Sequence, residues 1–410
     1  MAAVASSTSP RRHFAELLAE ARARTILLVS PLSPQDMHTQ PDQAVQPVLW
    51  ELERIVGFEE QWLVGSSTPA EPASYDEWFD RMMEVRQRTL ERLEAIDEAG
   101  TGPSVEHRFR LVLEHEFRCD EAILETLQLL GEVYRAPRRT SLPRGRRLAD
   151  PGAMARFPGG TVEVGAATES LTWPEEQPAH RAEVEPFWID VMPVTNGDFI
   201  TFMAAGGYMT AELWSEAGWS WVRSQEVRMP RHWIWEDGAW WSRWMDHSAP
   251  LDLTGPVGIV SYYEAEAFAR FVGKRLPTEL EWEAAAGWDP EAQARRSYPW
   301  GNMPPSPNVA NLDQLAFEPA AVGAFPGNLS PIGCYGLIGD LWEWTASDFL
   351  PYPGQDTTAA APFTSFESGS KVLRGGSWAT RPGAVRTTVR RPALPPARHV
   401  FAGFRCAHDA

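Results

Sequence analysis

The spacing of the apolar residues changes near residue 135 of this chain. Before it, long segments carry apolar residues three or four positions apart, the spacing of amphipathic α-helices. After it, apolar runs are short and interrupted by Gly and Pro, a pattern typical of strands and turns. The 410 residues also exceed the roughly 250–300 residues that one hydrophobic core usually serves. We therefore expect two domains of different kinds.

The first part of the chain predicts a four-helix bundle. We expect helices over residues 13–30, 47–64, 76–99 and 105–130. Pro47 suits the first turn of the second helix, and Gly131 can end the fourth. We assign residues 1–135 to the bundle. Residues 136–155, rich in Arg, Pro and Gly and without periodicity, are assigned to a linker.

Residues 156–410 predict an α+β domain with many irregular segments. Most of the 19 Trp residues lie there, and helices are expected over 196–205, 262–273 and 278–286. Thr278, followed three residues later by Glu281, predicts a capping box at the start of the last of these helices. The fold class expected is thus α + (α+β).

Charge and cysteine content exclude several classes of protein. The net charge of −18 argues against nucleic-acid binding, which needs a basic face. Three Cys residues without a CxxC pair provide neither a disulfide framework nor a Cys-rich zinc site. We see no signal peptide and no apolar run long enough to span a membrane. We expect a cytoplasmic protein with a small-molecule ligand; the oligomeric state stays open.

The motifs of the second part occur in a specific order. They are PFWIDVMPVTNGDFITFM, GKRLPTELEWEAAA, YPWG, ANLD, GCYGLIGDLWEWTAS, VLRGGSWATRP and FAGFRCA. Together they resemble the formylglycine-generating-enzyme (sulfatase-modifying-factor) family, which implies a C-type-lectin-like α+β fold. That family often binds Ca²⁺, and the resemblance implies Asn311, Asp313 and Asp340 as ligands. Its own activity uses a cysteine pair near the C-terminus, where this chain has only Cys406, so that activity is not expected.

Two segments of the bundle extend the resemblance to the whole chain. PVLWELERIVGFEEQWLV and HEFRCDEAILETLQLLG resemble the metal-helix segments of the ergothioneine-type sulfoxide synthases and of selenoneine synthase, which join a DinB-like bundle to this second domain. The resemblance implies Fe(II) held by three His, two of them at i and i+4. Residues four apart lie about 40° apart on a helix, so both imidazoles can reach one ion. The implied chemistry uses O2 to join a trimethylhistidine carbon to a thiol or selenol.

This chain departs from that pattern at the implied metal site. Only His115 remains, because Cys119 and Arg54 stand where the other two His are expected. A guanidinium stays protonated and does not coordinate a cation. Glu51, one turn before Arg54, is a possible replacement, so the sequence predicts at most a mixed iron site of Glu51, His115 and Cys119.

The implied substrate positions also differ, and the replacements are arginines. Arg118 replaces a Gln beside the second motif His, and Arg391 begins the stretch that replaces an Asn-Trp-Asp sequence. One hypothesis is that Arg54, Arg118 and Arg391 bind an anionic small molecule in the interdomain cleft, without iron. The alternative is that these arginines pair internally with nearby carboxylates. The carboxylates considered are Glu51, Glu53, Asp120 and Glu121.

The sequence leaves three functions open. The first is an enzyme of the sulfoxide-synthase family that forms a C–S or C–Se bond on a histidine derivative with an altered site. The second is a metal-free pseudoenzyme that binds an anion. The third is a non-iron enzyme that uses Cys119 or His115, with His115 and Arg118 lowering the pKa of the Cys119 thiol. The alternative for Cys119 is a small core residue, the commoner role of a free Cys on a helix face.

Overall fold

The computed structural model describes residues 10–65, 75–96, 103–137, 140–150, 152–167, 172–357, 366 and 368–410. The chain divides into two compact units, residues 1–137 and 138–410. Residue 140 already belongs to the second unit, since the Thr140 amide donates a hydrogen bond to the Leu315 carbonyl at 2.7 Å. The first strand of that unit begins at Met154.

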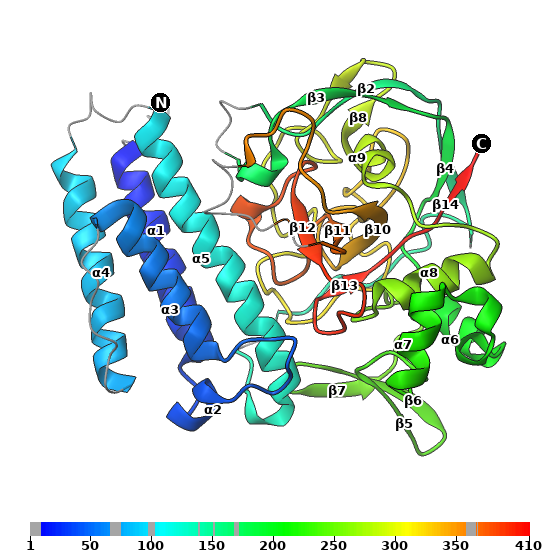
Figure 1. Cartoon of the computed structure of the whole chain (residues 1–410), viewed down its shortest axis with the longest axis horizontal. Helices are drawn as coiled ribbons and strands as arrows, with labels where there is room; N and C mark the ends of the chain where they lie inside the picture. The colour runs from blue at the N-terminus through cyan, green and yellow to red at the C-terminus, as the bar shows by residue number, and fades with distance from the viewer. Residues whose placement is uncertain are drawn as a thin grey trace, which may run out of the picture. The chain divides into compact units, whose positions relative to one another are not determined.

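The first unit is a bundle of four long helices that lie side by side (Figure 1). Its helices are α1 (Pro10–Val29), α3 (Val48–Glu59), α4 (Tyr75–Ala95) and α5 (Pro103–Leu130), with a short α2 (Pro34–His38). A π-helical turn, η1 (Glu60–Val64), continues α3, and Pro47 is the N-cap of α3. Leu18, Leu52, Met82 and Leu124 are buried between the helices. The predicted four-helix bundle is confirmed.

A ring of buried charges connects all four long helices. Each helix contributes one member, and we call the set the buried ion-pair ring: Arg22, Glu59, Arg86 and Glu116. Arg22 bonds both carboxylates, at 2.7 Å to Glu59 and 2.9 Å to Glu116. Arg86 does the same, at 2.7 Å and 2.5 Å. Two positive and two negative charges balance within the ring, so the ring as a whole carries no net charge.

The second unit is built from small sheets. A four-stranded sheet has the order β12-β11-β10-β13, and two three-stranded sheets have the orders β1-β4-β14 and β5-β6-β7. The pairs β2-β3 and β8-β9 complete the set described. The strands are β1 Met154–Phe157, β2 Gly160–Val164, β3 His180–Val184, β4 Phe187–Asp190, β5 Trp233–Glu236, β6 Ala239–Trp244, β7 His247–Pro250, β8 Trp288–Asp289, β9 Ala294–Arg295, β10 Trp342–Asp348, β11 Lys371–Arg374, β12 Arg390–Ala393, β13 Ala402–Gly403 and β14 Ala407–Asp409. The predicted α+β class is confirmed.

Four α-helices pack around these sheets. They are α6 (Asn196–Ala204), α7 (Glu216–Ser224), α8 (Tyr262–Phe271) and α9 (Glu279–Gly287), of which the sequence analysis had not predicted α7. The capping box of Thr278 and Glu281 is present at α9 and confirms the prediction. Behind it, the buried Trp282 donates its indole N–H to Glu343 at 2.7 Å, which fixes α9 against β10.

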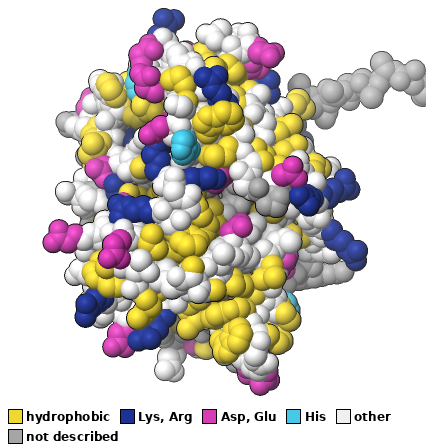
Figure 2. All heavy atoms as spheres, turned by 90° about the vertical axis from the view of Figure 1, so that its right-hand side faces the viewer, with side chains coloured by type: hydrophobic (Ala, Val, Ile, Leu, Met, Phe, Trp, Pro, Cys, Tyr) yellow, Lys and Arg dark blue, Asp and Glu magenta, His cyan; other side chains and the backbone are white. Residues whose placement is uncertain are grey.

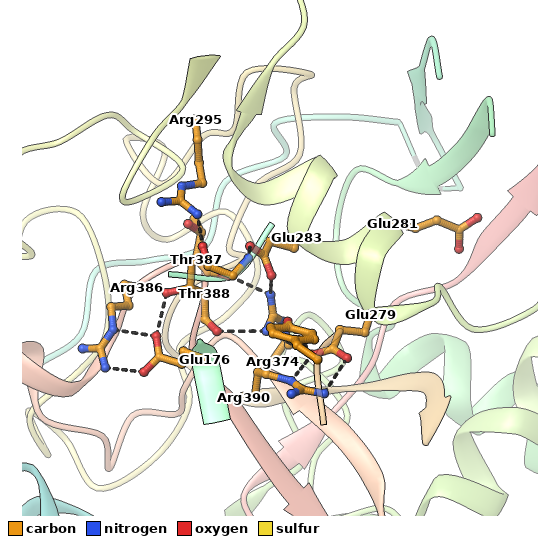
Figure 3. Close-up of polar contacts among 12 residues, drawn as sticks. Glu176, Glu279, Glu281, Glu283, Arg295, Arg374, Arg386, Thr387, Thr388 and Arg390 are labelled. Atoms are coloured by element: carbon orange, nitrogen blue, oxygen red, sulfur yellow. Dashed lines mark hydrogen bonds and ion pairs between the residues drawn. The ribbon is translucent and has the colours of Figure 1, made fainter. Parts of the chain in front are cut away.

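A second set of buried charges holds α9 to the C-terminal strands (Figure 3). Arg390 pairs with Glu279 at 2.5 Å, and Arg374 contacts both Glu279 and Glu283 of α9. The Tyr352 hydroxyl donates to Glu279 at 3.2 Å. Arg374 and Arg390 therefore stabilise the fold of the second unit, because their partners are carboxylates of the same unit.

Surface charge follows no single-sign pattern on the face drawn in Figure 2, where basic, acidic and hydrophobic side chains interleave. Among the helices of the described ranges, none is both long and apolar enough to cross a bilayer.

Candidate functional site

The structure brings the two motif positions of α5 together. His115 and Cys119 lie one turn apart, with 3.6 Å between the His115 Nε2 and the Cys119 Sγ. Both side chains are buried. The His115 Nε2 also lies 3.3 Å from the backbone carbonyl oxygen of Arg54, so it faces α3. The helical spacing thus places both side chains on the α3 side of α5, as expected.

Arg54 and Glu51 form the α3 half of this site. Their side chains make an ion pair of 2.8 Å across one helical turn, between the Arg54 Nη1 and the Glu51 Oε2. Glu51 is buried, whereas 42% of the Arg54 side chain is exposed. The internal pairing considered from the sequence therefore occurs between Arg54 and Glu51.

Aromatic side chains that the sequence analysis did not single out complete the site. The Phe58 ring stacks on the His115 imidazole, with 4.0 Å between ring centroids and an interplanar angle of 18°. The Arg54 guanidinium lies 5.0 Å from the ring centre of Trp50, which is 43% exposed. Trp50, Arg54 and Phe58 follow each other at i and i+4, a signal that places them on one helix face.

The electrostatics of the site keep His115 neutral. Burial, and then the positive charges of Arg54 and Arg118, lower the pKa of His115 to about 3. Two guanidinium groups therefore act on this imidazole from two helices, since Arg54 belongs to α3 and Arg118 to α5.

The thiol of Cys119 does not behave as the sequence analysis proposed. Burial raises its pKa well above the ordinary value, and Glu51 raises it further, although Arg54 acts in the opposite direction. The expectation that its neighbours favour the thiolate is wrong, because the fully buried sulfur has lost the water that would solvate its charge. Cys406, the single cysteine near the C-terminus, is also buried and has a raised pKa.

Arg391 lies in the second unit, on β12. Its guanidinium lies 5.7 Å from the ring centre of the buried Trp342. Neighbouring strand residues point to opposite faces, so Arg390 enters the buried charge network while Arg391 faces the other way. The grouping of Arg391 with Arg54 and Arg118 stays a prediction.

The predicted calcium ligands already form hydrogen bonds or ion pairs with other groups of the protein. The Asp340 carboxylate accepts hydrogen bonds from the Asn311 amide at 2.9 Å and the Ala320 N–H at 2.8 Å. Asp313 pairs with Arg381 at 3.1 Å. The Asn311 Oδ1, in contrast, is buried without a hydrogen-bond partner. Burial raises the pKa of Asp340 to about 6, so no strong cationic partner acts on it, and calcium binding stays a prediction.

The donor set on α3 and α5 does not fit ferrous iron. Glu51 is occupied by a guanidinium, whose fixed positive charge would oppose a dication at the same place. Within the described ranges, no group of three or more His, Cys, Asp or Glu side chains is arranged to hold a metal ion. Glu51, His115 and Cys119 therefore lie close together, but their side chains are not arranged to coordinate one metal ion.

Comparison with known proteins shows to which family the chain belongs. The Sulfatase-modifying factor enzyme 1-like domain matches residues 140–410, and the DinB superfamily matches residues 17–118. The chain is 35% identical to hercynine oxygenase of Mycolicibacterium smegmatis, over 97% of this chain and 99% of the relative. This chain belongs to the hercynine oxygenase family. Hercynine oxygenase of Mycobacterium tuberculosis is 34% identical over 98% of the chain and its own full length.

Membership of the hercynine oxygenase family confirms the two-domain resemblance proposed from the motifs. The second domain by itself is also similar to a protein named as inactive. The chain is 37% identical to inactive C-alpha-formylglycine-generating enzyme 2 of Mus musculus, over 63% of this chain and 86% of that relative.

Proposed function

We propose that this member of the hercynine oxygenase family binds a small carboxylate-bearing molecule at the α3–α5 site, without iron. A histidine derivative such as hercynine is the first ligand to consider, because the full-length relatives carry that name. Arg54 is the observation that supports the proposal. It stands beside His115, where the family resemblance implies a metal ligand.

The Arg54 guanidinium has capacity to bind a ligand. It carries five N–H donors, and Glu51 accepts a hydrogen bond from one nitrogen only. The side chain is partly exposed, so an incoming carboxylate can reach the other donors without unfolding the helix. A guanidinium and a carboxylate form two parallel hydrogen bonds, an arrangement stronger than a neutral pair.

The surrounding groups favour an anion over a cation. The positive charges of Arg54 and Arg118 both act on His115, which stays neutral. Trp50 offers an exposed ring beside the guanidinium for an imidazole or another flat group of the ligand.

Isothermal titration of the metal-free protein with hercynine, in the presence of a chelator, tests the proposal. We expect saturable binding, and we expect Arg54→Met to weaken it about tenfold or more, because a charge-assisted hydrogen bond contributes roughly 1.5–3 kcal/mol. Arg12→Met is the matched control, because Arg12 also pairs with a Glu one turn away in the same unit. That control should leave the affinity unchanged.

Oxidative C–S or C–Se bond formation on a histidine derivative is the competing function. It is supported by the identity to hercynine oxygenase over nearly the whole chain. The proposal is overturned if the chelated protein fails to bind hercynine. It is also overturned if protein loaded with Fe(II) consumes O2 when hercynine and a thiol or selenol are added.

A further inference from the structure

The second unit contains a cavity of about 470 Å³ that the α3–α5 site does not involve. Its walls come from residues 145–150, 152 and 153, from the end of β4 and the start of α6, and from the end of α8. Cavities that hold small organic ligands in proteins typically measure about 300–1,000 Å³. The size therefore suits a small molecule.

The start of this wall, at residues 145 and 146, packs closely against the rest of the second unit. A Cβ at Gly145 would lie 2.8 Å from the Ala321 Cβ, and one at Gly323 would lie 2.1 Å from the Arg146 carbonyl oxygen. Gly323 also has a φ of +75°, which favours glycine. Glycines on both sides of this contact let the segment lie against residues 321–323, so the cavity wall is encoded in the sequence.

The cavity is largely apolar and opens to solvent. Phe268 and Val194 line it and are buried, whereas Leu253 and Val272 also line it and remain 54% and 40% exposed. These side chains give the cavity an apolar surface that the apolar part of a ligand can cover.

One cation inside this cavity has unused hydrogen-bond donors. The Lys274 ammonium donates to the Asp190 Oδ1 at 2.5 Å, its one polar side-chain partner within the described residues. The other oxygen of Asp190 accepts the Cys406 N–H at 2.9 Å. An ammonium has three donors, so two remain, on a side chain that is only 19% exposed.

The other charges around the cavity do not oppose an anion. Arg147 and Asp150 pair with each other at 2.8 Å. Asp198 accepts the Thr195 N–H and hydroxyl in the N-terminal cap of α6. Arg146, on the cavity wall, is exposed and forms no ion pair with described residues. Three cationic and three anionic side chains line the cavity, so its charged lining is neutral as a set although the whole chain carries −18.

We propose that this cavity is a second small-molecule site, which takes an amphipathic monocarboxylate. The carboxylate accepts hydrogen bonds from Lys274, and the apolar body of the ligand covers Phe268, Leu253 and Val272. This site lies in the second unit and does not depend on the function proposed for α3 and α5.

Titration of the full chain with decanoate and with 1-decanol at physiological ionic strength tests this site. Charges beyond about 8 Å are then screened, so the net charge of the chain has little influence. We expect decanoate to bind with one equivalent and more tightly than decanol. Lys274→Met should weaken decanoate at least tenfold and leave decanol unchanged, whereas Val272→Trp, which fills the cavity from an exposed position, should weaken both.

Three results would overturn the proposal: no decanoate binding to the unmodified chain, binding that survives Val272→Trp, or equal affinity for the acid and the alcohol. The comparison of decanoate with decanol uses the unmodified chain, so it tests the proposal even if Lys274→Met does not fold. Loss of hercynine binding at Arg54→Met would leave the decanoate result unaffected, which separates the two proposals.

Discussion

At the scale of single residues, Arg54 explains most of what distinguishes this site. Its guanidinium stands where the family resemblance implies a metal ligand, pairs with the carboxylate of Glu51 and contributes to the neutral state of His115. An imidazole that faces two positive charges in a buried place cannot accept a proton near neutral pH. It remains able to accept or donate a hydrogen bond to a ligand.

The pKa of His115 gives a direct prediction. In the unfolded chain His titrates near 6.5, and in the folded chain near 3, so the unfolded state holds the extra proton between these values. The contribution of His115 to stability is therefore complete above pH 6.5 and falls as the pH is lowered toward 3, by at most about 1.4 kcal/mol per pH unit.

Two-dimensional NMR of the His115 ring measures this pKa. We expect its signals to stay at the neutral position from pH 7 down to about 4, and we expect Arg54→Met to raise the midpoint because one positive charge is gone. A midpoint near 6.5 in the unmodified chain would show that His115 is solvated and would contradict the geometry described.

At the scale of elements, α3 and α5 carry the site, and the buried ion-pair ring fixes how they face each other. Glu59 directly follows Phe58 in the sequence of α3, and Glu116 directly follows His115 in α5, so the stacked aromatic pair and the ion-pair ring come from the same turns of these helices. Although burial opposes ionisation, Arg22 and Arg86 lower the pKa of Glu116 to about 2. The carboxylate is thus ionised and paired.

Removing one member of this ring should be costly. Arg86→Met leaves Glu59 and Glu116 with one guanidinium between them, and we expect a loss of about 3–5 kcal/mol of unfolding free energy. Arg110→Met is the control, because its pair with Glu106 is exposed and should contribute less than about 1 kcal/mol. Urea unfolding measures both. Similar small losses in the two variants would mean that the ring does not hold the bundle.

The helices and strands also show which features can be predicted from the sequence. Apolar spacing predicted the long helices, and the Thr278–Glu281 signature predicted a cap, because both depend on residues close in sequence. The buried ring was not predicted, since Arg and Glu in a helical pattern resemble a solvated face until distant helices meet. The order β12-β11-β10-β13 and the stacking of Phe58 on His115 depend on the same long-range packing.

At the scale of the whole molecule, the chain keeps both domains of the hercynine oxygenase family. The fold depends on apolar packing and on buried charge pairs such as those of α9 (Figure 3), which do not involve Arg54, His115 or Cys119. A site can therefore change its chemistry without loss of the architecture.

Iron stoichiometry tests the central claim most directly. The unmodified chain and the variant Arg54→His/Cys119→His are each incubated anaerobically with Fe(II), desalted and analysed for metal. The variant supplies three imidazoles, which suit iron, so we expect it to retain close to one equivalent of iron. We expect the unmodified chain to retain almost none. Retention of one equivalent by the unmodified chain, lost on His115→Ala, would contradict the account.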